Sequence, residues 1–283
     1  MIKTDLHIHT GYSDGKYSPE EVLKTAKSKG LGIISVTDHD NFEGSAKTLE
    51  FNGRQDIRII PGIEISADFN GKEIHILGYY LNFTDKSLIQ HLDFIKNLRV
   101  RRFEKTINKL LDLGVKINPD NLIKKYSGSH SIGRPHIANE LVEQGLVKNF
   151  NTAFHRYLGD NKPAHVKKEN LDYNVIIELI HKAGGLAFVA HPSNYFRESS
   201  LLKLKNSGID GIETVHPSHT SNQTQKFTKF AEEHNLLTCG GSDFHGFYDE
   251  DFANMGKYCV GEDTVLRMEE KLLTHGKYSK RQS

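Results

Sequence analysis

Short runs of β-branched residues alternate with amphipathic helical stretches over about the first hundred residues and again after about residue 172. This alternation is typical of βαβ units and constrains the fold to the α/β class. A helix between the first two strands is marked by the capping sequence Ser18-Pro19-Glu20-Glu21 at its start and by Gly30 at its end. We expect seven strands, at residues 2–6, 32–37, 57–63, 73–79, 186–190, 210–215 and 236–240.

The middle of the chain interrupts this alternation. Apolar residues recur at helical spacing from about 85 to 113, which predicts one long helix. Further helical stretches follow without convincing strands, at about 119–126, 134–145 and 150–158. We therefore predict an α/β domain formed by residues 1–98 and 165–283, with a helical insertion domain at 99–164.

Charge and composition narrow the range of partners. The chain has 37 Lys and Arg against 36 Asp and Glu, a formal net charge of +1, so tight non-specific binding to nucleic acid is not expected. No stretch approaches the roughly 18 apolar residues of a membrane span, and we expect a cytoplasmic protein without membrane association. Cys239 and Cys259 are expected to be reduced thiols, and the sequence leaves the oligomeric state open.

Histidine is frequent, with 16 copies, and many stand with Asp or Glu in short clusters directly after the predicted strands. Imidazole and carboxylate groups together are common ligands of zinc, iron and manganese. In a barrel of parallel strands the loops that follow the strands meet at one mouth, so clusters far apart in the sequence are expected to form one site. The candidate metal ligands, which are also the candidate catalytic residues, are His7, His9, Asp14, His39, Glu64, His75, His191, Asp243 and His245.

Local geometry indicates that these residues can share ions. His7 and His9 are two apart on an extended segment and therefore point to the same side. The Asn-Gly pair at 70–71 predicts a two-residue hairpin turn, which places Glu64 and His75 on one face as diagonal neighbours. Because a carboxylate can bridge two cations, we predict a site for two or three divalent metal ions, Mn, Fe or Zn.

Other interpretations exist for single members of the set. A lone histidine at a strand end is more often a hydrogen-bonding loop residue than a ligand, and Asp14, near two glycines, could form a turn. Strand ends that all carry such residues favour a metal site with several ions instead. Asp38 and Asp40 are expected to support the ligands or to cap local structure rather than to bind metal.

Several short motifs resemble those of the PHP (polymerase and histidinol phosphatase) metallophosphoesterases, over nearly the whole chain outside the insertion. They are His-Ile-His-Thr at 7–10, Ser-Asp-Gly at 13–15, Thr-Asp-His at 37–39, Pro-Gly-Ile-Glu-Ile-Ser at 61–66, Ala-His-Pro at 190–192 and Gly-Ser-Asp-Phe-His-Gly at 241–246. The resemblance implies a distorted (β/α)7 barrel, the PHP fold, with three metals at its mouth. It also implies a first metal held by His7, His9, Glu64 and Asp243, a second by Glu64, His75 and His191, and a third by Asp14, His39 and His245.

The arginines of the insertion point to a phosphorylated substrate, although similar metal clusters also serve carbonyl chemistry. Arg99 and Arg102 share one face of the long helix, and Arg134 precedes a helix that begins with Pro135. A solvated charged face is the alternative for the first two. The Gly-Arg-Pro-His stretch resembles one PHP branch, the 3′,5′-nucleoside bisphosphate phosphatases and short-RNA 5′-to-3′ exonucleases, which implies that the three arginines hold a substrate phosphate. His136 is expected either to donate to a phosphate or to cap the insertion helix.

We therefore predict a metal-dependent phosphoesterase that hydrolyses 3′,5′-nucleoside bisphosphates or short RNA oligonucleotides by in-line attack of a metal-bridging hydroxide. The helical insertion would serve as a substrate lid. His216 and His219 are expected near the mouth, where they either contact the substrate and donate a proton to the leaving oxygen or act as ordinary loop histidines. The alternatives are a histidinol-phosphate phosphatase, another small-molecule phosphomonoesterase, or a metal-stabilised binding module without catalysis.

Overall fold

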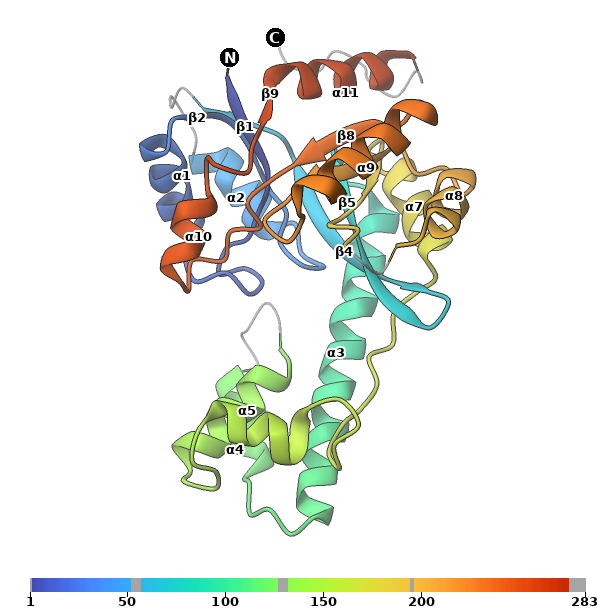
Figure 1. Ribbon diagram of the computed structural model, residues 1–283. Coiled ribbons are helices and arrows are strands. Elements are labelled where there is room, and N and C mark those ends of the chain that lie inside the picture. The colour runs from blue at the N-terminus through green and yellow to red at the C-terminus, as the bar shows by residue number, and fades with distance from the viewer. Residues whose placement is uncertain (1, 52–56, 127–131, 194–195, 275–283) are drawn as a thin grey trace. The chain divides into compact units, whose positions relative to one another are not determined.

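The computed structural model describes residues 2–51, 57–126, 132–193 and 196–274 (Figure 1). The chain forms two compact units, one from Met1–Gln90 with Asn170–Ser283 and the other from His91–Glu169. The first unit contains strands and helices, and the described part of the second is helical. The predicted class, α/β with a helical insertion, is therefore confirmed.

The strands belong to two sheets of the first unit. They are β1 (Lys3–Ile8), β2 (Leu31–Val36), β3 (Arg58–Ile59), β4 (Gly62–Phe69), β5 (Lys72–Tyr79), β6 (Leu186–Val189), β7 (Gly211–Val215), β8 (Leu237–Gly240) and β9 (Val260–Gly261). One sheet has the order β3-β2-β1-β9 and the other the order β4-β5-β6-β7-β8. The pairs β1–β2, β2–β3, β6–β7 and β7–β8 are parallel, whereas β5 pairs antiparallel with both of its neighbours.

Two single bridges join these sheets into a ring. Ile8 at the end of β1 pairs with Phe244, just beyond β8, and His39, beyond β2, pairs with Glu64 of β4. The ring has seven positions, as the sequence predicts, but the expected strand at 57–63 is divided into β3 and the start of β4. Its closure by isolated bridges in place of continuous ladders explains why the barrel is distorted. Strand β9, antiparallel to β1, is not anticipated by the sequence pattern.

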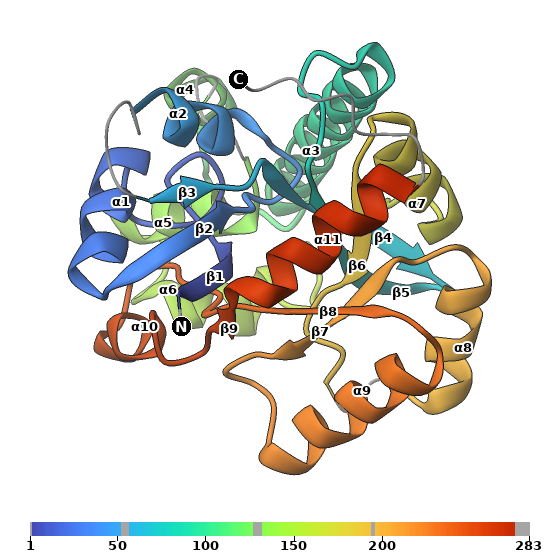
Figure 2. The same cartoon turned by 90° about the horizontal axis from the view of Figure 1, so that it is seen from above.

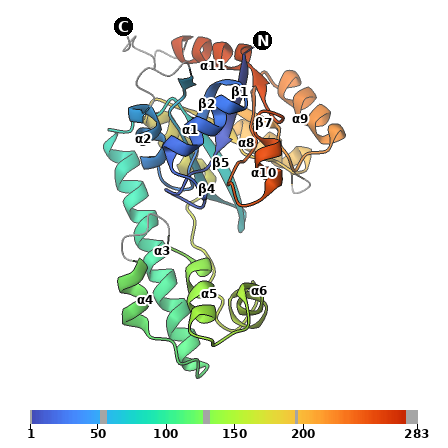
Figure 3. The same cartoon turned by 90° about the vertical axis from the view of Figure 1, so that its left-hand side faces the viewer.

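Helices surround this ring and close one of its ends. In the first unit they are α1 (Pro19–Ser28), α2 (Glu43–Phe51), α7 (Tyr173–Lys182), α8 (Glu198–Asn206), α9 (Ser221–Glu233), α10 (Asp249–Asn254) and α11 (Glu262–Thr274). Helix α1 begins with a capping box in which Ser18 accepts from the Glu21 amide and the Glu21 carboxylate accepts from the Ser18 amide at 2.9 Å. It lies beside α2 (Figure 3), and its Val22 and Leu23 are buried in a cluster with Ile8 of β1 and Ile34 of β2. The short helices α2 and α10 are missed by the sequence analysis.

The interior of the ring is closed at one end by α11, which lies across the strands in Figure 2. Val265, Met268 and Leu272 of this helix join a buried cluster with residues from five strands, such as Leu6 of β1 and Phe188 of β6. Leu186, the first residue of β6, belongs to the same cluster, and Leu237, the first residue of β8, packs against it. Helix α11 therefore plugs the end at which the parallel strands begin, and the opposite end remains for a site.

A buried carboxylate ties three elements together at this plugged end. Asp210, just before β7, accepts hydrogen bonds from His181 of α7 at 2.7 Å and from the amide of Ala187 in β6 at 2.9 Å. Lys271 of α11 lies 3.1 Å from its other oxygen. Burial alone would raise the pKa of Asp210, but the hydrogen bonds and the lysine charge outweigh burial and lower it.

The second unit has its own core. Helix α3 (Lys86–Asp112) begins in the first unit and continues into the second, close to the predicted span of 85–113. The helices that follow are α4 (Pro119–Tyr126), α5 (Arg134–Glu143), α6 (Phe150–Ala153) and the π-helix η1 (Phe154–Leu158). Phe103 and Ile107 of α3 pack with Ile137 and Leu141 of α5 in a cluster that closes this unit. Among the described helices, none is long and apolar enough to cross a membrane.

Candidate metal centre and active site

The nine candidate ligands come together at the end of the ring where the parallel strands finish. His7 lies near the end of β1, Glu64 in β4 and His75 in β5, and the others follow β1, β2, β6 and β8 in loops. The described residues form five groups of three or four possible ligands, and the ligand atoms within each group lie within 4.8 Å of one another. Each of the nine residues belongs to at least one of these groups. Residues separated by more than two hundred positions in the sequence thus form one cluster.

Glu64 is the centre of this cluster. Its Oε1 lies 3.0 Å from Nδ1 of His75 and 3.0 Å from Nε2 of His191. Its Oε2 lies 3.3 Å from Nε2 of both His7 and His9, and 3.1 Å from Nδ1 of His39. A single carboxylate, 1% exposed, therefore faces five imidazole rings.

The hairpin of β4 and β5 explains why Glu64 and His75 meet. Phe69 pairs with Lys72 across the turn, Ser66 pairs with His75, and Glu64 pairs with Leu77. This register is the predicted one, and it is set by the two-residue turn at 70–71. Because β5 runs antiparallel, its start lies at the same end of the ring as the ends of the parallel strands.

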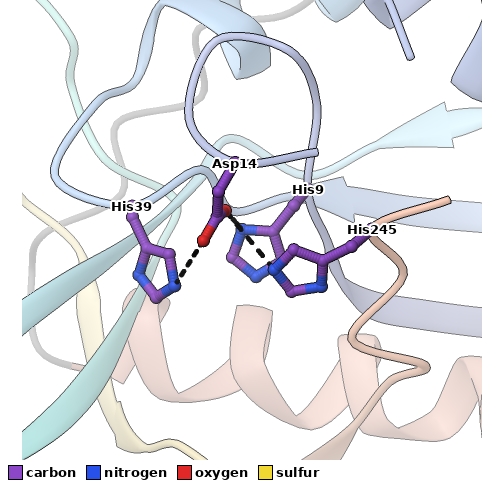
Figure 4. A group of neighbouring side chains, drawn as sticks. All are labelled: His9, Asp14, His39 and His245. Atoms are coloured by element: carbon purple, nitrogen blue, oxygen red, sulfur yellow. Dashed lines mark ion pairs between the residues drawn. The ribbon is translucent and has the colours of Figure 1, made fainter. Parts of the chain in front are cut away.

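A second group surrounds Asp14, which is carried by the loop after β1 (Figure 4). Its Oδ1 lies 3.3 Å from Nε2 of His245 and 3.6 Å from Nδ1 of His9. Its Oδ2 lies 3.6 Å from Nε2 of His39. His9 and His39 thus face both Asp14 and Glu64, so the two groups are contiguous.

Asp243 completes the cluster on the side of β8. Its Oδ1 lies 3.1 Å from Nε2 of His9 and 3.4 Å from Nε2 of His7, and its Oδ2 lies 3.4 Å from Nε2 of His216. Asp243 and His191 have backbone φ values of 51° and 26°, in the left-handed region that non-glycine residues rarely adopt. Such backbone strain persists where the surroundings fix a residue in a functional orientation.

Glu213 of β7 orients two of the candidate ligands, and it is not among the predicted site residues. It is fully buried, and its Oε1 accepts from Nδ1 of His7 at 2.9 Å. Its Oε2 accepts from the backbone amide of His191 at 2.6 Å. A proton on Nδ1 leaves the lone pair of His7 on Nε2, the atom that faces Glu64 and Asp243. The sequence does place Glu213 near the end of a predicted strand, and this position was the one signal that could have identified it as a site residue.

Two further carboxylates hold the loops of the site. Asp38 accepts from the amide and hydroxyl of Thr10 at 2.8 and 2.6 Å and from the Ser13 hydroxyl at 2.6 Å. Asp40 accepts from the amide of Ser66 at 2.8 Å. Both contacts agree with the supporting role expected for these two aspartates, since they fix the backbone beside the candidate ligands.

A glycine and an aspartate fix the approach of the last loop to β1. A side chain at Gly241 would collide with the backbone amide of His7. Asp5 accepts from the amides of Ser242 at 3.0 Å and His7 at 3.3 Å, and burial raises its pKa to about 7. Close passage of the loop through Gly241 therefore places Asp243 against His7.

The donor atoms of this cluster fit divalent cations. Nε2 of His7, both ring nitrogens of His9, Nδ1 of His39 and Oε2 of Glu64 are buried and make no hydrogen bond with the described residues. A buried polar atom without a hydrogen-bond partner lowers the stability of the folded protein. The presence of five such atoms in one place therefore indicates a bound ligand that interacts with all of them. Imidazole nitrogens and carboxylate oxygens suit zinc, iron and manganese.

Electrostatics lead to the same conclusion. Burial disfavours the charged form of His9, but Asp243 and Glu64 outweigh burial and raise its pKa to about 10. Glu64 likewise raises the pKa of His75 to about 9, whereas burial lowers that of His39 to about 3. The surrounding imidazoles hold the pKa of Glu64 well below its usual value, although burial opposes this. The carboxylates therefore favour positive charge here, whether as protons or as bound cations.

Two further histidines, His216 and His219, lie beside the cluster in the segment after β7. Nδ1 of His216 accepts from the amide of Ser218 at 3.1 Å, so in the neutral ring the proton is on Nε2, the atom near Asp243. His219 donates from Nδ1 to the carbonyl of Thr214 at 3.1 Å. His216 therefore reaches the cluster, and the ring of His219 lies 5.5 Å from the ring of His216.

The three predicted arginines meet in the helical unit. Arg99, Arg102 and Arg134 line one small pocket, together with Phe103 and Ile137 among others. Arg101 is more exposed and does not line this pocket, although it lines a second small pocket together with Arg102.

Protein atoms also contact these side chains. Arg134 donates to Asp160 at 2.8 Å and to the carbonyl of Leu158 at 3.0 Å, and Arg102 donates to the carbonyl of Val166 at 2.9 Å. The ring of His136 accepts from the Gly133 amide at 3.2 Å, which is the helix-capping alternative of the sequence analysis.

Comparisons with known proteins place the whole chain among its relatives. The PHP domain model matches residues 5–212. A 5′-3′ exoribonuclease of Haemophilus influenzae is 33% identical over 279 residues, covering 95% of this chain and 98% of the relative. A 3′,5′-nucleoside bisphosphate phosphatase of Chromobacterium violaceum is 31% identical over 250 residues, covering 87% and 88%. A solved structure from Bifidobacterium adolescentis, described as a metal-dependent phosphoesterase, has a TM-score of 0.79 and 25% identity, with 94% of each chain covered. The chain therefore belongs to the PHP domain family and is a metal-dependent phosphoesterase.

Proposed function

We propose that this phosphoesterase hydrolyses phosphate esters of nucleotides, either 3′,5′-nucleoside bisphosphates or short RNA oligonucleotides. The observation that carries the proposal is the position of Glu64, whose two oxygens lie 3.0–3.3 Å from nitrogens of five histidines. The names of the two relatives that cover most of the chain support the substrate class.

Two or three divalent ions, Mn, Fe or Zn, would be held by the nine clustered residues. His7, His9, Glu64 and Asp243 would hold one, and the groups around His75 and around Asp14 would hold the others. When bound, such ions lower the pKa of a coordinated water and neutralise the charge of phosphoryl oxygens. The protein contributes the fixed positions of the ligands, through Glu213 in particular.

His216 is the residue that we propose as proton donor to the leaving oxygen. Its Nδ1 is occupied by the Ser218 amide, so a proton on Nε2 is available at the edge of the cluster. Nε2 is buried and makes no hydrogen bond with the described residues, so a bound substrate atom would be a suitable acceptor for its proton. His219 would fix the loop through its bond to Thr214 and take no direct part.

The arginine pocket of the helical unit would hold a second phosphate of the substrate. Its three guanidinium groups come from α3 and from the start of α5, where helix amides also favour an anion. Asp160, which is largely exposed, would release Arg134 when a doubly charged phosphate competes for it. In this proposal the helical unit acts as a substrate lid, and a second phosphate distinguishes nucleotide substrates from simple monoesters.

The test compares adenosine 3′,5′-bisphosphate, a short 5′-phosphorylated RNA and histidinol phosphate as substrates of the manganese-loaded enzyme. We expect the first two to be hydrolysed with much higher kcat/KM than the third. Arg134→Ala should lower kcat/KM for the bisphosphate by about thirtyfold. This factor corresponds to the loss of about 2 kcal/mol, which is typical of a hydrogen bond to a charged group. Arg156→Ala, which removes an exposed arginine stacked on Tyr157, is the control and should have no effect.

The alternative function has its own signature in the same experiment. A histidinol-phosphate phosphatase would prefer histidinol phosphate and would be indifferent to Arg134→Ala. Thermal unfolding of each variant is measured alongside, because Arg134 also contacts Asp160 and Leu158. Unchanged kcat/KM in a folded Arg134→Ala enzyme would contradict the proposed phosphate grip.

A further inference from the structure

A cavity of about 580 Å³ opens beside the metal cluster and is not used by any step described so far. It lies within the α/β unit, between the β4–β5 hairpin and the described residues 190, 191, 193, 196 and 200. His75 and His191, two of the candidate ligands, form part of its wall. The cavity is therefore continuous with the place where a phosphate would be attacked.

The wall of this cavity combines flat apolar groups with a polar rim. Phe69, Ile74 and Phe196 supply the apolar part. Phe69 is held edge-on by Tyr173, with ring centres 4.8 Å apart, and lies 6.1 Å from Phe196. The polar residues of the wall include Asn70, Lys72, Ser193 and Ser200.

The size of the cavity decides what kind of group can occupy it. A phosphate alone would leave most of 580 Å³ empty, whereas organic ligands occupy pockets of about 300–1,000 Å³. The occupant must also be joined to a phosphate at the cluster, since His75 and His191 belong to both places. An aromatic wall with hydrogen-bonding groups at the rim suits a planar heterocycle with polar edges.

We propose that this cavity binds the nucleobase of the substrate, by packing the base against Phe196 and by hydrogen bonds from the rim. The inference rests on the proposed function, because it assumes a nucleotide phosphate at the metal cluster. It adds that specificity for nucleotides arises in the α/β unit as well as from the arginines. The same base site would serve a mononucleotide or the terminal residue of an RNA.

A pair of adjacent serines on α8 provides the test. Ser200 lines the cavity and Ser199 is exposed and does not, so Ser200→Trp fills the cavity and Ser199→Trp is a matched control. The chain contains no tryptophan, so the fluorescence of each variant reports only the introduced ring. A blue-shifted emission in Ser200→Trp, relative to Ser199→Trp, verifies that the cavity is filled.

The measured quantities are the affinity for adenosine 5′-monophosphate and ribose 5-phosphate, by calorimetry, and kcat/KM for a nucleoside bisphosphate and its base-free analogue. The wild-type enzyme should prefer the compound with a base by about tenfold or more, in line with stacking on an aromatic side chain. Ser200→Trp should abolish that preference and leave the base-free compounds unaffected. Ser199→Trp should behave as the wild type.

The outcomes separate this proposal from the function on which it rests. Binding of the monophosphate that is no tighter than that of ribose 5-phosphate, or a preference that survives in Ser200→Trp, would overturn the base site. Absence of hydrolysis of every nucleotide, with the binding preference intact, would overturn the proposed reaction alone. Should Ser200→Trp fail to fold, Phe196→Leu removes the ring with little loss of apolar volume and must reduce the same preference. A dinucleotide substrate, measured in parallel, distinguishes RNA ends from mononucleotides.

Discussion

Replacement of Glu213 by glutamine should disturb metal binding without removing any ligand. The carboxylate accepts two hydrogen bonds, from Nδ1 of His7 at 2.9 Å and from the amide of His191 at 2.6 Å. The amide of glutamine offers one accepting oxygen and one donating nitrogen. In one of the two contacts, two hydrogen-bond donors would therefore face each other and repel, unless the proton of His7 moves from Nδ1 to Nε2.

Either outcome affects a candidate ligand. If the proton moves to Nε2, His7 loses the lone pair that faces Glu64 and Asp243. If it does not, the repelled amide displaces the backbone of His191, which is already held at a φ of 26°. Loss of a hydrogen bond that orients a metal ligand weakens metal binding by about 10–100-fold, or about 1.4–2.8 kcal/mol.

The assay is competition for Mn²⁺ against a chelator of known affinity, followed by calorimetry of the metal-free protein. Glu233→Gln, at an exposed position of α9, is the matched control and should bind metal as the wild type does. Thermal unfolding of the metal-free proteins shows whether the variant is folded. Metal affinity within about twofold of the wild type in folded Glu213→Gln would refute the orienting role.

Two further predictions concern stability. Asp210→Asn should lower the free energy of unfolding by about 2 kcal/mol at pH 7, because Asp210 is buried and bonded to His181. The pKa of Asp210 is lowered from 3.8, so this stabilisation is present above that pH and is lost as the pH falls below it. The test is urea unfolding of the wild type and Asp210→Asn at pH 7 and pH 3. The same difference in unfolding free energy between the two proteins at both pH values would contradict this assignment. His136→Ala should lower the melting temperature of the helical unit by removing the acceptor of the Gly133 amide, worth about 1 kcal/mol, while Asn139→Ala on the exposed face should not. A fall in kcat/KM at unchanged stability would instead favour the phosphate-donor alternative for His136.

The cluster could be anticipated from the sequence because its members follow a topological rule. His7, His39 and His191 each lie near or just beyond the end of a strand of a βα unit, and parallel strands bring such ends to one side. His75 does not obey this rule, and it was placed by the turn at 70–71, whose two-residue geometry fixes the register of the hairpin. Local turn chemistry thus determined a contact between Glu64 and His75.

Features that depend on packing between distant segments were not accessible in the same way. The contact of Glu213 with His7 requires β7 and β1 to be placed to within an ångström, and a single acidic residue in a strand gives no spacing signal. The two-residue strand β9 is defined by its pairing with β1, because it is too short to show a periodic pattern. The strand expected at 57–63 is divided because β3 pairs with β2 whereas β4 pairs with β5. No local sequence pattern indicates this change of partner.

The cavity beside the cluster also depends on packing between distant segments, so it could not be predicted from the sequence. Phe69 ends one arm of the hairpin and Phe196 precedes α8, so their rings meet only after the sheet and helix are assembled. The arginines of the helical unit were easier to group, because Arg99 and Arg102 lie one helical turn apart and share a face. Their approach to Arg134 depended on the packing of α5 against α3.

The central claim is that Glu64 joins the imidazoles of this cluster into one centre for several cations. Its most direct test is the number of metal ions per chain, by elemental analysis of manganese-loaded wild type and Glu64→Gln, with hydrolysis of adenosine 3′,5′-bisphosphate measured on the same samples. The account predicts two or three ions in the wild type, the loss of at least one in the variant, and a fall in kcat of more than about a hundredfold. A folded Glu64→Gln protein with the full complement of metal and undiminished hydrolysis would contradict it.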